Sequence, residues 1–270
     1  QDYSYAMEWF FKADAQNNTD AQNGLGLCYY NGYGVDQDYE KAVEYFTKAA
    51  EQGHVMSQTY LGICYYNGYG VEQDYAKAAE WNAKAAEQGD SEALKELGLS
   101  YYLGEGVEQS YDKAIELWLL ASEKDNADAQ NYLGNCYYEG KGVEQDYAVA
   151  VEWYTKAATL GHADAQNTLG WCYYNGLGTE RNDSKAFEWF KNSSNQNHAQ
   201  AQYNQGNCYY HGRGVKQNYE QSFECYRKSA EQGVAEAQFS LGNCYFEGKG
   251  VDQDYSYAME WFFKADAQNN

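Results

Sequence analysis

The sequence predicts an all-α fold, an α/α superhelical solenoid built from tandem helical hairpins of 36 residues. Two observations support this prediction. A helix glycine returns every 36 residues without one insertion or deletion, and a phrase of aromatic and glycine residues follows it each time. A fixed period of this size is typical of repeat proteins, in which each unit is too small to bury its own apolar face and must stack on its neighbours.

The glycines that define the repeat occupy two fixed positions. The helix glycine stands at Gly26, Gly62, Gly98, Gly134, Gly170, Gly206 and Gly242. The first turn glycine stands at Gly32, Gly68, Gly104, Gly140, Gly176, Gly212 and Gly248, and a second turn glycine follows two residues later. Proline is absent from the 270 residues, so glycine is expected to make the turns.

The first 18 residues predict a single helix, which is half a repeat. Ala6, Phe10 and Ala13 fall on one stripe at three- and four-residue spacing, so we expect this stripe to face the core. The second helix of the first full unit, at roughly 38–52, carries its own stripe of Ala42, Phe46 and Ala49 at the same spacing.

Each full unit is expected to be a helical hairpin. In the unit that begins at Thr19, the first helix covers roughly 19–31 and ends where Gly32 offers a left-handed conformation. Asp38 stands where a side-chain oxygen caps the second helix. The predicted layout is a single repeat domain over 1–270, with the half repeat 1–18 and full repeats 19–54, 55–90, 91–126, 127–162, 163–198, 199–234 and 235–270.

Charge argues against two classes of partner. With 19 Lys and Arg against 40 Asp and Glu, the formal charge of −21 repels nucleic-acid phosphates and anionic lipid. No apolar run reaches the roughly 18 residues of a membrane span, so membrane insertion is not expected.

Two phrases recur along the chain, A-x-x-x-L-G-x-x-Y-x-x-G-x-G-V and D-Y-x-K-A-x-E-W-x-x-K-A-A. Residues 129–143 carry the first and residues 146–158 the second. Together they closely resemble the Sel1-like repeat, a relative of the tetratricopeptide repeat. The resemblance covers the whole chain and implies a right-handed superhelix that works as an adaptor in signalling, in quality control of exported proteins or at a bacterial cell surface. It implies no catalysis. The constant unit length departs from the variable lengths usual in the family.

The two ends of the chain have the same sequence. Residues 253–270 repeat residues 1–18 letter for letter, whereas residues 37–54 match them at 9 of 18 positions. Three causes are open: a longer polypeptide with a 252-residue higher-order repeat, ends that are copies for assembly, or a duplication made when the chain was prepared.

Both end helices look uncapped. The terminal units of a free solenoid normally carry a polar outer face, but these helices are rich in large apolar residues. The residues expected at the assembly ends are Trp9, Phe10, Phe11, Met259, Trp261, Phe262 and Phe263. We infer that the stack continues past both ends, covalently or by head-to-tail contact. A fragment of a longer adaptor is the alternative.

An aromatic ladder is the other candidate surface. It consists of Tyr30, Tyr66, Tyr102, Tyr138, Tyr174, Tyr210 and Phe246, one residue past the core stripe of each first helix. Such a ladder could hold an extended peptide, a glycan or a neighbouring rod. Packing between adjacent first helices is the alternative and the favoured interpretation.

Other patterns favour structural roles. Six cysteines share one repeat position and are expected to be small buried packing residues, while Cys225 could approach Cys208 or Cys244. His54, His162 and His198 share one loop position and have no metal-ligand spacing. Glutamates such as Glu44 recur singly with a lysine four residues on, which indicates helix ion pairs and not paired catalytic carboxylates. Glycosylation sequons occur at Asn17, Asn182 and Asn192.

The sequence therefore predicts a non-enzymatic structural solenoid that stacks end to end, covalently continuous or head to tail, into a rod or filament. We expect it outside the cell or on its surface, with further copies of itself as partner. The alternative is a soluble adaptor that binds a protein partner, or a glycan, in a concave groove. No catalytic residue, cofactor or metal site is expected, because every polar group recurs as an isolated copy and none converges with others.

Overall fold

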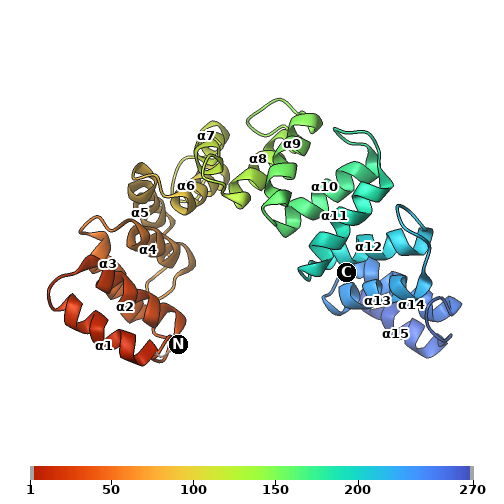
Figure 1. Ribbon diagram of the computed structural model, residues 1–270, viewed down its shortest axis with the longest axis horizontal. Helices are drawn as coiled ribbons and strands as arrows, with labels where there is room; N and C mark the ends of the chain where they lie inside the picture. Colours follow the sequence, from red (N-terminus) through yellow and green to blue (C-terminus); the bar gives the residue numbers. More distant parts are fainter. Residues whose placement is uncertain (1–2, 268–270) are drawn as a thin grey trace. The chain divides into compact units, whose positions relative to one another are not determined.

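The computed structural model describes residues 3–267 and shows an all-helical chain (Figure 1). Over those residues it contains fifteen helices and no strand, which confirms the predicted fold class. The described residues form two compact units, one of 3–129 with 141–143 and the other of 130–140 with 144–267. The single continuous domain expected from the repeats stays a prediction.

Even-numbered helices are the first helices of the hairpins, and odd-numbered helices from α3 onward are the second helices. The first unit holds α1 (Tyr3–Asp14), α2 (Thr19–Asn31), α3 (Tyr39–Ala50), α4 (Val55–Asn67), α5 (Tyr75–Glu87), α6 (Ser91–Leu103) and α7 (Tyr111–Ser122). The second holds α9 (Tyr147–Thr159), α10 (Ala163–Asn175), α11 (Asp183–Asn195), α12 (Ala199–His211), α13 (Tyr219–Glu231), α14 (Ala235–Glu247) and α15 (Tyr255–Asp266). Helix α8 (Ala127–Glu139) has its first turn in the first unit and the rest in the second.

The caps of each hairpin lie where the repeat predicts them. Gly32 closes α2 with a φ of 75°, and its backbone N–H donates to the carbonyl of Cys28. The Asp38 side chain accepts a hydrogen bond of 3.0 Å from the backbone N–H of Lys41 and so caps α3. These residues satisfy backbone groups that a helix end leaves without an intrahelical partner.

The core of each hairpin is a glycine of the first helix packed against a large side chain of the second. A Cβ atom placed on Gly170 would lie 2.7 Å from the ring of Phe190, and one on Gly134 would lie 2.6 Å from Tyr154. The full set of pairs is Gly26 with Phe46, Gly62 with Asn82, Gly98 with Trp118, Gly134 with Tyr154, Gly170 with Phe190, Gly206 with Tyr226 and Gly242 with Phe262. The predicted stripe of α3 is confirmed, since Ala42, Phe46 and Ala49 are fully buried.

The second turn glycine joins one hairpin to the hairpin before it. Gly70 lies so close to the backbone of Tyr39, at the start of α3, that a Cβ atom would overlap the carbonyl group. In the second unit Gly178 lies in the same way against Tyr147. A hairpin contacts the one before it through its first helix and through this turn. The glycine therefore sets how closely neighbouring hairpins stack.

The predicted stripe of α1 is only partly buried. Ala6, Phe10 and Ala13 are half-buried, and the buried residue of this helix is Met7, which is 4% exposed. The reason is the neighbour that α1 has: it packs mainly on the following first helix, α2, with a ring contact from Phe11 to Tyr45 of α3, whereas α3 packs on both α2 and α4.

Asn82 of α5 is an exception within the repeated core. It is 2% exposed and takes the place that Phe, Trp or Tyr occupies in every other hairpin. Its Oδ1 atom has no hydrogen-bond partner. A buried amide oxygen without a partner destabilises the fold, because its hydration is lost and not replaced.

We expect Gly170→Ala to lower the free energy of unfolding by about 1–2 kcal/mol, because the overpacking cost exceeds the gain in helix propensity. Urea unfolding followed by circular dichroism measures the change. With Phe190→Leu added, the loss should be smaller than the sum of the two single losses. Additive losses would show that the glycine is not required by that ring.

Asn82→Phe should raise the free energy of unfolding by about 1–3 kcal/mol, because it removes an unsatisfied oxygen and adds apolar burial. Asn82→Ala is the matched control, which removes the amide without filling the space and should stay below the phenylalanine variant. Thermal unfolding of the three chains tests the order, and a destabilised phenylalanine variant would contradict it.

Candidate functional site

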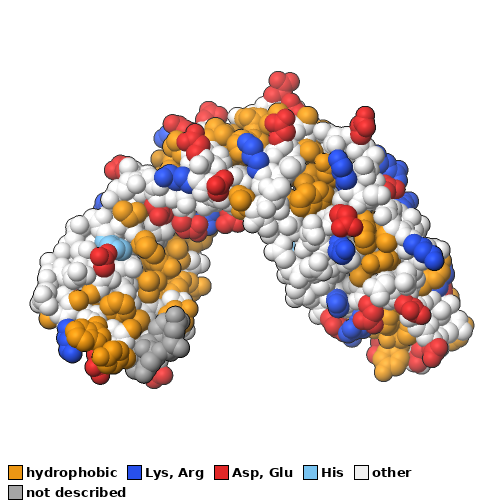
Figure 2. Space-filling view, in the orientation of Figure 1, with side chains coloured by type: hydrophobic (Ala, Val, Ile, Leu, Met, Phe, Trp, Pro, Cys, Tyr) orange, Lys and Arg blue, Asp and Glu red, His pale blue; other side chains and the backbone are white. Residues whose placement is uncertain are grey.

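Helix α1 has one covered face and one open face. Met7 is buried in a cluster with Leu25 and Cys28 of α2. On the other side, Trp9 is 56% exposed and Phe11 is 42% exposed. Figure 2 shows hydrophobic side chains at the surface in the region of α1. The predicted end residues of α1 are therefore accessible, apart from Phe10, which is half-buried.

Helix α15 is covered on the opposite face. Phe262 packs on Gly242 of α14, and Trp261 is half-buried against the α13 and α14 cluster. Met259 is 50% exposed and Phe263 is 66% exposed. Two of the four predicted residues at this end are thus fully available, and the other two help to hold α15 in place.

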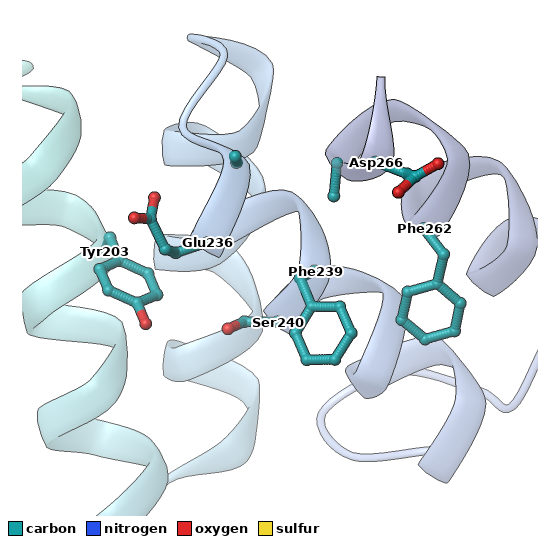
Figure 3. A pocket seen from close by; sticks show the side chains of 8 residues that line it. Tyr203, Glu236, Phe239, Ser240, Phe262 and Asp266 are labelled. Atoms are coloured by element: carbon teal, nitrogen blue, oxygen red, sulfur yellow. The ribbon is translucent and has the colours of Figure 1, made fainter. Parts of the chain in front are cut away.

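A groove opens beside α15 in the second unit (Figure 3). It has a volume of about 560 Å³, and Tyr203, Phe239 and Phe262 supply its aromatic walls. The rings of Phe239 and Phe262 lie 5.4 Å apart, and Phe239 is 54% exposed. The carboxylates of Glu236 and Asp266 stand at its rim. The groove has aromatic walls and a polar rim, and it is large enough to take side chains of a packed helix.

The tyrosines of the ladder are half-buried between consecutive hairpins. Their rings meet the second helix of their own hairpin, as Tyr30 does with Phe46 at 6.2 Å and Tyr174 with Phe190 at 6.4 Å. Tyr30 also meets Tyr60 of the next first helix at 5.7 Å. Phe246 differs, since it is 51% exposed.

The ladder hydroxyls bond to the following turn. Tyr66 donates to Glu105 at 2.7 Å, and the Lys249 ammonium donates to Tyr210 at 2.8 Å. Burial is the main cause that raises the pKa of Tyr30 to about 12. These contacts assign the ladder to packing between hairpins. Its role as a binding surface stays a prediction.

The cysteines are all free thiols, and six of them are buried as expected. Burial raises the pKa of Cys64 to about 12 and that of Cys225 to about 11, which works against a reactive thiolate. Cys225 lies 3.6 Å from the side-chain oxygen of Gln205 and forms no disulfide with Cys208 or Cys244.

The loop histidines are helix caps, which the sequence did not reveal. Nδ1 of His198 accepts a hydrogen bond of 3.1 Å from the backbone N–H of Ala201 at the start of α12. Because Nδ1 accepts, the ring proton is on Nε2, which lies 2.7 Å from Asp164 of the preceding first helix. His54 makes the same pair of contacts with Ser57 and Asp20. His54 and His198 thus each join two hairpins.

Paired glutamines are a second feature that the sequence analysis missed. A glutamine in the loop after a second helix donates to a buried glutamine in the first helix of the same hairpin, for example Gln232 to Gln202 at 2.7 Å. The other pairs are Gln52 with Gln22, Gln88 with Gln58 and Gln196 with Gln166. The signal was available, because the two glutamines recur 30 residues apart.

The sequon asparagines Asn17, Asn182 and Asn192 are all exposed. Asn182 caps α11 by accepting from Lys185, and Asn17 donates to Gln52. Their glycosylation stays a prediction.

Metal-binding clusters and membrane-spanning helices are both absent over residues 3–267. No group of three or more His, Cys, Asp or Glu side chains in that range is placed to hold a metal ion. Within the same range, the helices are too short or too polar to span a bilayer.

The Sel1 repeat family matches the whole chain, over residues 1–18, 19–54, 55–90, 91–126, 127–162, 163–198, 199–234 and 235–270. A search of curated proteins found no match. Among solved structures, a protective antigen of uropathogenic Escherichia coli with an SLR fold is 38% identical, with a TM-score of 0.88. The match covers 98% of this chain but only 56% of the antigen's chain. A Sel1 repeat protein from Oxalobacter formigenes is 31% identical, with a TM-score of 0.77 and coverage of 98% and 76%.

We expect His198→Ala to lower the free energy of unfolding by about 1–2 kcal/mol, since α12 loses its cap and the bond to Asp164. His198→Asn is the matched variant. It keeps a cap oxygen but is too short to reach Asp164, so its stability should fall between those of the parent and the alanine variant. Urea unfolding measures both changes, and equal losses would mean that the cap contributes nothing.

Proposed function

The chain belongs to the Sel1 repeat family, and on that premise we propose that it is a non-enzymatic structural solenoid that stacks end to end, covalently continuous or head to tail, into a rod or filament. Solenoids of this family typically serve as scaffolds for protein interactions. The proposal adds that the partner is a further copy of the chain and that the working surfaces are the open faces of α1 and α15.

One observation carries the proposal. Both end helices expose large apolar side chains that the interior hairpins bury. Met259 of α15 is 50% exposed, whereas the interior residues at the same repeat position, Val43, Phe187 and Phe223, are at most 8% exposed. In α1, Phe10 is half-buried, whereas the equivalent Phe46 is fully buried. An exposed apolar helix face gains free energy when another surface covers it.

The contacts of the polar residues support a structural role. The recurring carboxylates are used as helix caps or as helix ion pairs, such as Glu44 with Lys48 at 2.8 Å. The recurring histidines cap helices, and the cysteine thiols are buried. A catalytic site needs dissimilar groups that converge at one point, and these groups are similar and spread along the repeats.

A location outside the cell or on its surface is part of the proposal. It is supported by the likeness to a protein described as a protective antigen, since an antigen that protects must be accessible.

An adaptor is the second candidate, in which a protein partner lies along the first helices. The observation that favours it is a pocket of about 360 Å³ in the second unit, lined by Asn207 and Tyr210 of α12 and by Asn243 and Glu247 of α14. Amide side chains offer both a donor and an acceptor to a peptide backbone. An adaptor of this kind would stay monomeric.

The test is the mass of the chain over a concentration series, by light scattering and electron microscopy. We expect elongated particles that lengthen with concentration, and a monomer of 30.7 kDa only on dilution. Met259→Glu should weaken association at least about tenfold, because it places a charge in the apolar contact.

Met56→Glu is the matched control, because Met56 is 49% exposed and belongs to the interior helix α4. Its association should equal that of the parent. A monomer at every concentration would rule out assembly and leave the adaptor, and equal effects of the two variants would place the contact elsewhere.

A further inference from the structure

The two end helices are one sequence placed against two different neighbours. Met7 of α1 is 4% exposed, because it lies among Leu25 and Cys28 of α2. The same residue in α15, Met259, is 50% exposed. Because the Met7 face of α1 is covered by α2, the same face of α15 fits a first helix like α2.

The comparison also holds in the other direction. In α15, Ala258 is fully buried and Ala265 is 6% exposed, because α14 packs on that face. The equivalent Ala6 and Ala13 of α1 are only half-buried. Each end helix is thus covered on the face that is open on the other. A helix that had both neighbours would be an ordinary second helix, like α3 between α2 and α4.

We propose that copies join by helix replacement, in which α15 of one copy takes the place of α1 on α2 of the next copy. This joint rests on the proposed end-to-end assembly and specifies its contact. It places one second helix between two first helices, α14 of its own chain and α2 of the next. Helices α3, α5, α11 and α13 all pack in this way within their units. Docking with α1 still in place would set two second helices face to face.

The groove beside α15 fits α2 of the second copy. Phe262 lines this groove together with Phe239 (Figure 3). In α1 the equivalent Phe10 lies over Gly24 of α2, where a Cβ atom would be 3.0 Å from the ring. Phe262 can therefore pack over Gly24 of the second copy, because α15 has the same sequence as α1.

Replacement of α1 by α15 also keeps a polar contact to α2. Gln22 of α2 donates to the Asp14 carboxylate of α1 at 3.0 Å. Asp266 of α15 is the equivalent residue and stands exposed at the rim of the groove. In the joint it accepts from Gln22 of the second copy, so replacement leaves that buried amide with its partner.

Preorganisation favours the replacement. Helix α1 packs mainly on α2, with one ring contact from Phe11 to Tyr45 of α3, and these contacts must compensate for the entropy lost when the helix becomes ordered. Helix α15 is already ordered by α14 and brings the same side chains at a lower entropic cost.

Two substitutions of the same residue test the joint, and replacement gives them opposite signs. Met259→Glu should block association, because α15 can no longer dock on α2. Met7→Glu should strengthen association by roughly tenfold or more, because it weakens the hold of α1 on α2 and frees the docking surface. If Met7→Glu weakens association or leaves it unchanged, replacement is wrong and end-to-end assembly still stands.

A cross-link tests the contact without destabilising α1. In the joint, residue 259 occupies the place of Met7 beside Cys28, so mild oxidation of Met259→Cys should link residue 259 to Cys28 of another copy, as mapped by peptide mass spectrometry. The link should vanish when Cys28→Ala is added, and Met56→Cys should form none with Cys28. Assembly without this link overturns replacement alone, whereas no assembly at any concentration overturns both proposals.

Discussion

The close approach of a first-helix glycine to a large side chain of the second helix is the contact on which the rest of this structure depends. A methyl group at Gly98 would lie 2.5 Å from the indole of Trp118, so no other residue type permits this spacing. The second turn glycine makes an equally close approach to the preceding hairpin. Both glycines recur every 36 residues, so together they set the packing within each hairpin and against the hairpin before it.

Periodicity was sufficient to predict the hairpins. The first helix expected at roughly 19–31 is observed at Thr19–Asn31, and the caps at Gly32 and Asp38 follow from local backbone chemistry. The local pattern does not predict which residues are buried where this depends on the neighbouring helices. The stripe of Ala6, Phe10 and Ala13 was expected to be buried, but which face of a second helix is covered depends on the helices beside it.

The polar contacts between hairpins were harder to predict for a related reason. A histidine in a loop is usually a surface residue, and only its position three residues before the N–H of Ala201 makes His198 a cap. The ladder tyrosines were predicted as a packing column or a binding surface, and their distances to Phe46 and Glu105 assign them to packing. Because the repeat places a partner in a neighbouring hairpin, these repeated side chains pack between hairpins.

The surfaces left over are those of the helices with a single neighbour, and their charge limits how they can be used. A chain with a net charge of −21 repels its own copies, but at physiological ionic strength salt screens this repulsion beyond about 8 Å. Apolar contact acts only at shorter range, where Met259 and Phe263 meet another surface. Contact at the α15 end covers apolar area, and the carboxylates of Glu236 and Asp266 stand at the rim of its groove, where salt screens them. This balance supports the proposed end-to-end contact.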